Sequence, residues 1–90
     1  MALAPNYPNP FNAQTAIPYT LPEESAVEIQ IYNPAGQQVR TLAKEGQPAG
    51  AHLAWWDGMD QRGQPVASGI YLYTLKAGAF VAARKMILLR

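Results

Sequence analysis

The fold class of this chain is decided by the stretch Val27-Glu28-Ile29-Gln30-Ile31-Tyr32, which is followed by Asn33-Pro34-Ala35-Gly36. In the first part, apolar and more polar residues alternate with a period of two, which is typical of a β-strand with one buried face. The second part indicates a turn, because proline presets φ at its second position and glycine accepts a positive φ. A strand of about residues 38–42 is then expected to pair back as a hairpin.

Short runs of the same kind lie on both sides of this hairpin. The sequence predicts further strands at about residues 15–20, 52–56, 69–76 and 80–89, with loops at 21–25, 44–50 and 57–65. Pro18 lies within the first of these strands and predicts an edge strand or a bulge, because proline cannot donate a ladder hydrogen bond. The pattern predicts one all-β domain over residues 1–90, an antiparallel β-sandwich of about seven strands.

Both ends of the chain are expected to be structural. Residues 1–12 contain three prolines and are predicted to form an extended N-terminal arm that lies on the surface rather than inside a sheet. Tyr7 and Phe11 are its predicted anchors to the core. Residues 80–90 are expected to form a closing strand that is hydrogen-bonded into one of the sheets.

Composition narrows the class of protein. Of the 90 residues 49% are apolar, only 14% are charged, and the formal net charge is +1. An average globular domain has about 25% charged residues, so the low value favours a domain that contacts other proteins. The basic residues are scattered and no apolar run is long enough to span a membrane, so we expect neither a nucleic-acid partner nor a membrane span. The absence of cysteine excludes disulfides and thiolate sites, and we expect a monomer.

Few side chains could carry chemistry, and no catalytic site or cofactor is predicted. His52 is the only histidine, and Glu23 and Glu24 are adjacent residues of a loop; neither arrangement supplies a nucleophile, a base and an orienting acid together. Asp57 and Asp60 are candidates for binding calcium, because hard cations take carboxylate oxygens from such loops. The other interpretation is that both bond their own backbone, as aspartates in turns commonly do.

Aromatic residues allow two interpretations each. Tyr71 and Tyr73 lie on one face of a predicted strand, where they either fill the core with their hydroxyls on backbone partners, as in a tyrosine corner, or form a sugar-binding platform with both rings outside. If Trp56 is a core residue, Leu53 and Trp55 lie on the outer face. There they are either covered by a loop or by the arm, or they form a contact patch for a partner.

Five motifs, in this order, carry a resemblance to known domains. They are Asn6-Tyr7-Pro8-Asn9-Pro10-Phe11-Asn12, Tyr32-Asn33-Pro34-Ala35-Gly36-Gln37-Gln38-Val39, Trp56-Asp57-Gly58 with Asp60 and Gly63, Ser68-Gly69-Ile70-Tyr71, and Arg84-Lys85-Met86. Together they resemble the C-terminal sorting domain of type IX secretion substrates, over about Leu3 to Arg90. They are also similar to the immunoglobulin-like domain of flagellar hook-cap proteins of the FlgD type. Trp55 departs from the pattern, which usually has a small or polar residue there.

The resemblance implies an immunoglobulin-like sandwich that acts as a non-catalytic sorting and attachment module. Such a module directs its parent protein across the outer membrane of a Gram-negative bacterium, from the periplasm to the cell surface or the medium. The implied partners are the secretion machinery and the N-terminal domains of the parent. The residues implied in the secretion signal are Gly69, Tyr71, Lys85, Met86, Leu88, Leu89 and Arg90. For Lys85 the alternative role is that of an edge lysine that discourages sheet-to-sheet aggregation.

Two other functions remain open from the sequence. A carbohydrate-binding or other accessory module of an extracellular hydrolase would use Trp55, Tyr32 and Tyr7 as a planar platform. A hook-cap type domain would serve as a building block of an assembly.

Overall fold

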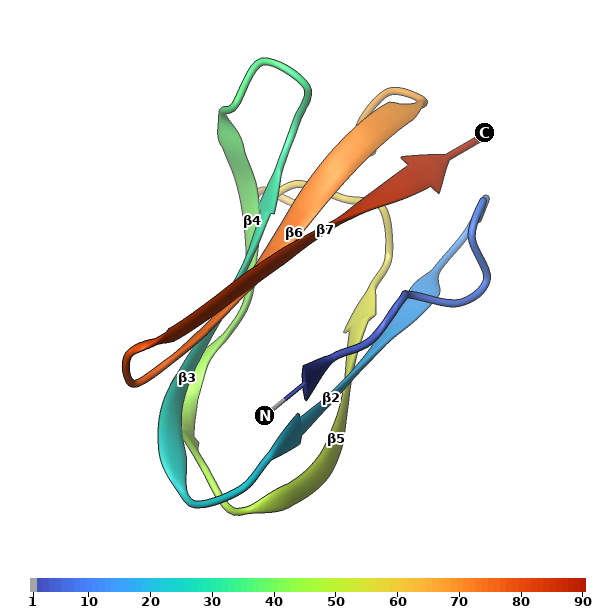
Figure 1. The fold of residues 1–90 in the computed structure, drawn as a ribbon. Coiled ribbons are helices and arrows are strands. Elements are labelled where there is room, and N and C mark those ends of the chain that lie inside the picture. The colour runs from blue at the N-terminus through green and yellow to red at the C-terminus, as the bar shows by residue number, and fades with distance from the viewer. Residues whose placement is uncertain (1) are drawn as a thin grey trace.

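The computed structural model describes residues 2–90, in which seven strands form two antiparallel sheets (Figure 1). One sheet has the order β1-β2-β5 and the other the order β4-β3-β6-β7. The strands are β1 (Ala2–Leu3), β2 (Thr15–Leu21), β3 (Ser25–Tyr32), β4 (Gln38–Gln47), β5 (Gly50–Trp56), β6 (Gly69–Ala77) and β7 (Phe80–Leu88). The predicted all-β sandwich with an immunoglobulin-like arrangement is confirmed. Met1, the first residue of the predicted arm, lies outside the described residues.

The core lies between the two sheets and is built from alternate residues of their strands. Trp56 is at its centre, fully buried, with its ring centroid 5.6 Å from that of Phe11 and 5.2 Å from that of Tyr71. The apolar face of β3 that the period of two predicted is therefore buried in the core. The largest fully buried side chains include Trp56, Tyr73, Ile17, Ile29, Ile31, Leu75, Met86 and Leu88.

Strand β4 is longer than the sequence predicted, and the expected loop at residues 44–50 is wrong. The strand continues to Gln47, because its backbone stays paired with β3 as far as the pair Ser25 and Gln47. Lys44 pairs with Glu28 in this register, and both side chains lie on the outer face of the sheet. The polar composition that indicated a loop thus reflects a strand with a solvated face.

Pro18 does not mark an edge strand or a bulge, because β2 lies between β1 and β5 and its register with β5 is continuous. Strand β1 ends at Leu3, and the next residue, Ala4, donates its amide hydrogen to the carbonyl of Pro18 at 2.9 Å. Any residue other than proline at position 18 would donate its backbone N–H to the Ala4 carbonyl, as the second bond of an antiparallel pair. That carbonyl instead accepts the hydroxyl of Tyr73 at 2.8 Å, which replaces the donor that proline lacks.

The N-terminal arm belongs to both sheets, so the expectation that it lies outside them is wrong. After β1, Tyr7 exchanges two backbone hydrogen bonds with Ala16 at 2.8 and 2.9 Å. Further on, the amide of Phe11 donates to the carbonyl of Ile87 at 3.0 Å, which places the arm beside the C-terminal end of β7 (Figure 1). These bonds arise because the arm follows the free side of β2 and then crosses to β7.

Phe11 is an anchor of the arm, as predicted, but Tyr7 is not, because its side chain is 54% exposed. The second anchor is Asn6, which is buried and whose amide donates to the Tyr73 hydroxyl at 2.9 Å. Its side-chain Nδ2 donates to Thr15 Oγ1 at 2.9 Å. The same Nδ2 donates to the Pro8 carbonyl at 3.4 Å, a contact that an aromatic ring could not make.

We predict that Tyr73→Phe destabilises the domain by about 1–3 kcal/mol, because it leaves the part-buried Ala4 carbonyl and the buried Asn6 amide without their hydrogen-bond partner. Urea unfolding followed by tryptophan fluorescence would measure the loss. Tyr32→Phe is the matched control, since its hydroxyl makes no hydrogen bond within residues 2–90. Equal unfolding midpoints for the two variants would contradict this account.

The buried tyrosines also predict a pH dependence. Burial raises the pKa of Tyr71 and of Tyr73 above the ordinary value of 10.0. Because the folded state favours the neutral phenols, their contribution to stability is complete below pH 10 and is lost as the pH rises above it. The melting temperature should therefore fall as the pH rises above 10, and less steeply in Tyr73→Phe. A slope unchanged by that substitution would contradict the assignment.

Candidate recognition surface

The outer face of the four-stranded sheet is apolar at one end. In the register of the sheet, Tyr32 of β3, Leu72 of β6 and Lys85 of β7 form one row across the strands. Ile70 and Ile87 form the next pair, and Ile70 is 55% exposed. An open groove of about 650 Å³ is lined by Tyr32, Ile70, Leu72 and Lys85 together with the turn that follows β3. We call this groove and its rim the β6 groove.

The opposite end of the same face is charged. Glu28 of β3 lies between Lys44 of β4 and Lys76 of β6 in the register. Charged side chains of both signs keep this end solvated and favour no apolar partner. A partner that uses apolar contacts would therefore dock at the β6 groove.

The turn at the rim of the β6 groove is held by its first residue. The Asn33 side-chain Oδ1 accepts the backbone amides of Ala35 at 3.0 Å and Gln37 at 2.9 Å. The amide of Gly36 donates to the Asn33 carbonyl at 2.9 Å, and Gly36 has a φ of 83°. The turn predicted from the sequence is confirmed, and its positive φ requires glycine.

The residues implied in secretion-signal recognition do not all reach the surface. Lys85 and Leu89 are exposed, and Lys85 lines the β6 groove. Met86 and Leu88 are fully buried because they occupy the inward positions of β7, so a partner of the folded domain cannot touch their side chains. They are core residues that place β7, and the part assigned to them in a secretion signal stays a prediction. Tyr71 and Gly69, expected to hold the neighbouring strand, lie in β6, where Tyr71 is buried.

Arg90 fastens the long loop that follows β5. Its backbone amide donates to Ser68 Oγ at 2.9 Å, and its Nε donates to the Val66 carbonyl at 2.7 Å. Its Nη2 donates to the Gly58 carbonyl at 2.5 Å, and a Cβ on Gly58 would lie only 2.8 Å from this nitrogen. Three nitrogen atoms of Arg90 therefore hold the loop of residues 57–68 in place by hydrogen bonds.

The two aspartates of this loop are bonded within the protein. Asp57 Oδ1 accepts Arg40 Nη1 at 2.9 Å and the backbone amide of Met59 at 3.1 Å. Asp60 Oδ1 accepts the amides of Gln64 at 3.0 Å and Arg62 at 2.9 Å, and these backbone hydrogen bonds lower the pKa of Asp60. The geometry is that of turn aspartates, and residues 2–90 contain no grouping of three or more histidine, cysteine or acidic residues suited to a metal ion.

Tyr71 and Tyr73 are core residues, and a sugar platform with both rings outside is excluded. The hydroxyl of Tyr71 donates to the carbonyl of Ala67, four residues upstream, at 2.6 Å, in the manner of a tyrosine corner. The three aromatics proposed as a planar platform do not share a surface. Tyr32 is in the four-stranded sheet, whereas Trp55 and Tyr7 lie on either side of Ala16 in the other sheet.

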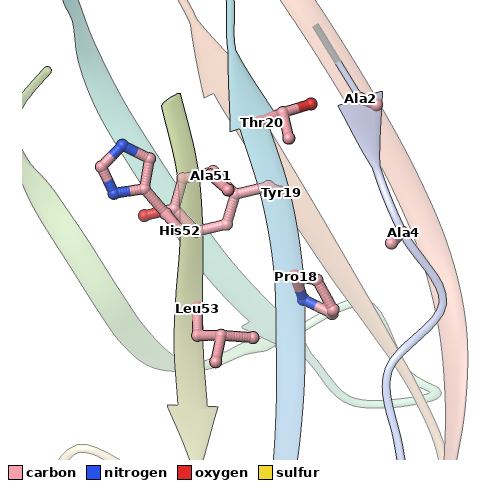
Figure 2. A pocket seen from close by; sticks show the side chains of 8 residues that line it. All are labelled: Ala2, Ala4, Pro18, Tyr19, Thr20, Ala51, His52 and Leu53. Atoms are coloured by element: carbon pink, nitrogen blue, oxygen red, sulfur yellow. The ribbon is translucent and has the colours of Figure 1, made fainter. Parts of the chain in front are cut away.

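Leu53 and Trp55 are uncovered, with exposed fractions of 51% and 53%. Neither a loop nor the arm lies over them, because the arm follows the other side of β2. Figure 2 shows Leu53 beside Pro18 of the neighbouring strand, in an open pocket of about 420 Å³ that Ala4 and Ala51 also line. No charged residue lines this pocket.

Sequence reasoning missed the β6 groove, although a signal for it was present. Ile70 and Leu72 occupy the positions of β6 that alternate with its buried residues. A strand with polar residues outside would not carry two large aliphatic side chains there, so the exception indicated a contact surface.

We predict that Arg90→Ala loosens the loop without unfolding the sheets. Hydrogen exchange should become faster for backbone amides of residues 58–66, because the carbonyls of Gly58 and Val66 lose their donors. The loss of global stability should be no more than about 1 kcal/mol, since the site is near the surface. Lys85→Ala is the control and should leave this exchange unchanged. Protection equal to that of the wild type would contradict the role given to Arg90.

The fold recurs in two much larger proteins of known structure. A structure of dimeric latent PorU from Porphyromonas gingivalis matches 97% of this chain with a TM-score of 0.73 and 19% identity. PorZ, described as an essential bacterial surface component of the type IX secretion system of the same organism, matches 98% with a TM-score of 0.67 and 16% identity. The chain spans only 9% of PorU and 11% of PorZ.

The remaining findings concern curated proteins, membrane-spanning helices and the protein family. No curated protein matches this chain. Within residues 2–90 there is no helix long and apolar enough to cross a membrane. The sequence model of the FlgD Ig-like domain matches residues 11–79, which is most of the chain. The chain therefore belongs to the FlgD Ig-like domain family.

Proposed function

We propose that this domain is a non-catalytic sorting and attachment module that directs a parent protein to the bacterial cell surface through the type IX secretion system. The observation that carries the proposal is that its whole fold recurs in PorZ, which is described as a component of that system. The five ordered motifs that resemble sorting domains add to it. The route would run through the periplasm and across the outer membrane, with the secretion machinery and the parent's other domains as partners.

The arrangement of β7 supports recognition of a folded surface rather than of a linear peptide. Met86 and Leu88 are buried, so only the outward side chains of β7 are accessible, among them Lys85 and Ile87. Lys85 lines the β6 groove, and Ile87 lies opposite Ile70, another residue of the groove lining. A receptor would combine apolar contacts in the groove with a partner for the Lys85 ammonium.

The surroundings of the polar side chains support a non-catalytic role. The Nε2 of His52 is 2.8 Å from the Pro48 carbonyl, and its ring stacks on Tyr19 with centroids 5.3 Å apart. Asp57 and Asp60 are engaged by backbone amides and by Arg40.

A structural role in an assembly is the second candidate, because the family to which the chain belongs takes its name from the FlgD Ig-like domain. In that case the domain would be a building block and would not carry a reporter to the surface. One transport experiment separates the two candidates.

A reporter with a periplasmic signal, joined at its C-terminus to residues 1–90, should reach the cell surface of a bacterium that has a type IX system. The variant Ile70→Ser with Lys85→Ser should reduce surface delivery at least about tenfold, because it removes an apolar and a charged contact of the β6 groove. These surface changes are preferable to deletion of β7, which would remove Met86 and Leu88 from the core.

The matched control is Glu28→Ser with Lys76→Ser, at the charged end of the same face. Thermal melting checks that both variants remain folded. A wild-type fusion that stays in the periplasm would overturn the sorting function and favour the assembly role. Normal delivery of the groove variant would overturn the assignment of the β6 groove.

A further inference from the structure

Free sheet edges are a liability in β-proteins, because their unpaired N–H and C=O groups can pair with another chain. This sandwich has four edge strands, β1, β4, β5 and β7. The chain caps three of them with its own groups, and each cap can be named. The exception is β5.

The edge of β4 is capped by Gln61 of the long loop, and the edge of β1 is capped by the side chain of Arg84. On β4, the Gln61 amide donates to the Val39 carbonyl at 2.9 Å, and the Thr41 amide donates to Gln61 Oε1 at 2.9 Å. The remainder of β4 carries Lys44 and its charged neighbours. On β1, the Leu3 carbonyl accepts Arg84 Nε at 2.7 Å.

The cap on β7 comes from the N-terminal arm. The Phe11 amide donates to the Ile87 carbonyl at 3.0 Å, and Asn9 Oδ1 accepts the Ile87 amide at 2.9 Å. The part of β7 beyond the arm carries Arg84 and Lys85. Charges of this kind discourage pairing with another strand.

On β5, the register identifies the backbone groups that face outward. The N–H and C=O of Ala16 in β2 are both hydrogen-bonded to Tyr7, so they point away from β5. In an antiparallel pair, when the N–H and C=O of one residue point away from the partner strand, those of the residue opposite also point away. Trp55 is opposite Ala16, so its N–H and C=O point to the free edge of β5. By the two-residue alternation, Leu53 and Ala51 also direct their N–H and C=O groups to the free edge. None of the three has a backbone hydrogen bond outside the sheet within residues 2–90.

Strand β5 lacks the protections seen on the other edges. From Gly50 to Trp56 it has no proline and no acidic, lysine or arginine residue, and its register with β2 has no bulge. The side chains of Leu53 and Trp55 stand on the exposed outer face beside this edge. The edge therefore offers backbone donors, backbone acceptors and apolar surface together.

We propose that β5 pairs antiparallel with β5 of a second copy of this chain, about a two-fold axis at Leu53. The two three-stranded sheets then become one continuous sheet. Leu53 lies opposite its equivalent, and Ala51 of one copy lies opposite Trp55 of the other. In this register every outward N–H of Ala51, Leu53 and Trp55 meets an outward C=O, whereas a register shifted by two residues leaves part of them unpaired.

A second copy fits this edge better than it fits any other. In this register the small Ala51 of one copy lies opposite the large Trp55 of the other, which leaves room for each Trp55 ring to lie over β5 of the partner copy. No charged side chain lies close to its equivalent at the axis. The same operation on β7 would place Lys85 and Arg84 near their equivalents, with repulsion between like charges. A two-fold axis also closes the pair, so that no filament forms.

The expected association is weak. A strand of seven residues buries less than the roughly 800 Å² per partner of a standard interface. We expect a dissociation constant of about 10⁻⁵ to 10⁻³ M. This proposal replaces the monomer expected from the sequence, because the free groups of β5 become visible only when its neighbours are known.

Sedimentation of the 90-residue chain between about 10 µM and 1 mM should show a monomer–dimer equilibrium in the range given above. Leu53→Lys should abolish it, because like charges would then lie opposite each other at the axis. Leu53→Pro should also abolish it by removing an outward N–H, and proline is tolerated at such an edge position. Ile70→Lys, at an equally exposed site of the other sheet, should leave the equilibrium unchanged. Melting temperatures report whether each variant folds.

A cross-linking experiment tests the register. The chain has no cysteine, and directly opposite residues in such a pair have Cα atoms about 5.5 Å apart, within disulfide range. Leu53→Cys should therefore form a covalent dimer under mild oxidation, whereas Ile70→Cys at the same concentration should not. A chain that stays monomeric up to 1 mM would overturn the proposal. Association lost in Ile70→Lys but retained in Leu53→Lys and Leu53→Pro would overturn it as well.

Discussion

The hydroxyl of Tyr73 holds the start of the chain against both sheets. It donates to the Ala4 carbonyl and accepts the Asn6 amide, at a place where Pro18 leaves the neighbouring strand without a donor. Because the arm is fixed here, Phe11 can enter the core beside Trp56 while its backbone pairs with Ile87. A buried hydroxyl with two partners is more specific than an apolar contact, since its loss leaves two unpaired polar groups.

The position of the arm decides which surfaces of the sandwich remain free. By lying beside β2 and then β7, the arm covers one edge of each sheet. The long loop after β5 covers part of β4 through Gln61, and Arg90 in turn holds that loop. Among the surfaces of residues 2–90, the edge of β5 and the apolar end of the outer face of the four-stranded sheet remain uncovered. The two surfaces lie on different sheets and so can serve different partners at the same time.

The end of the chain combines a structural and a surface role. Inward residues of β7 fill the core, and its outward residue Lys85 lines the β6 groove. A receptor that binds the outward residues therefore also tests whether the domain is folded, because β7 is placed by its pairing with β6 and by burial of Met86 and Leu88. In the proposed sorting role, this coupling would restrict export to parent proteins in which this domain has folded.

The amino-acid sequence by itself determined the class of fold. Alternation in Val27–Ile31 and the turn at Asn33–Gly36 follow from local pattern and turn chemistry, which act over a few residues. For Tyr71 and Tyr73 the local pattern allowed two interpretations, and the assembled core decided between them. The placement of Pro18 in a central strand, the burial of Asn6 in place of Tyr7, and the extension of β4 to Gln47 were decided by the tertiary structure. Each depends on partners distant in the sequence: Tyr73 replaces a missing donor, and β3 continues to pair with a polar segment. For the same reason only the assembled sheets separate Lys85 at the surface from Met86 in the core, and leave the edge of β5 unpaired.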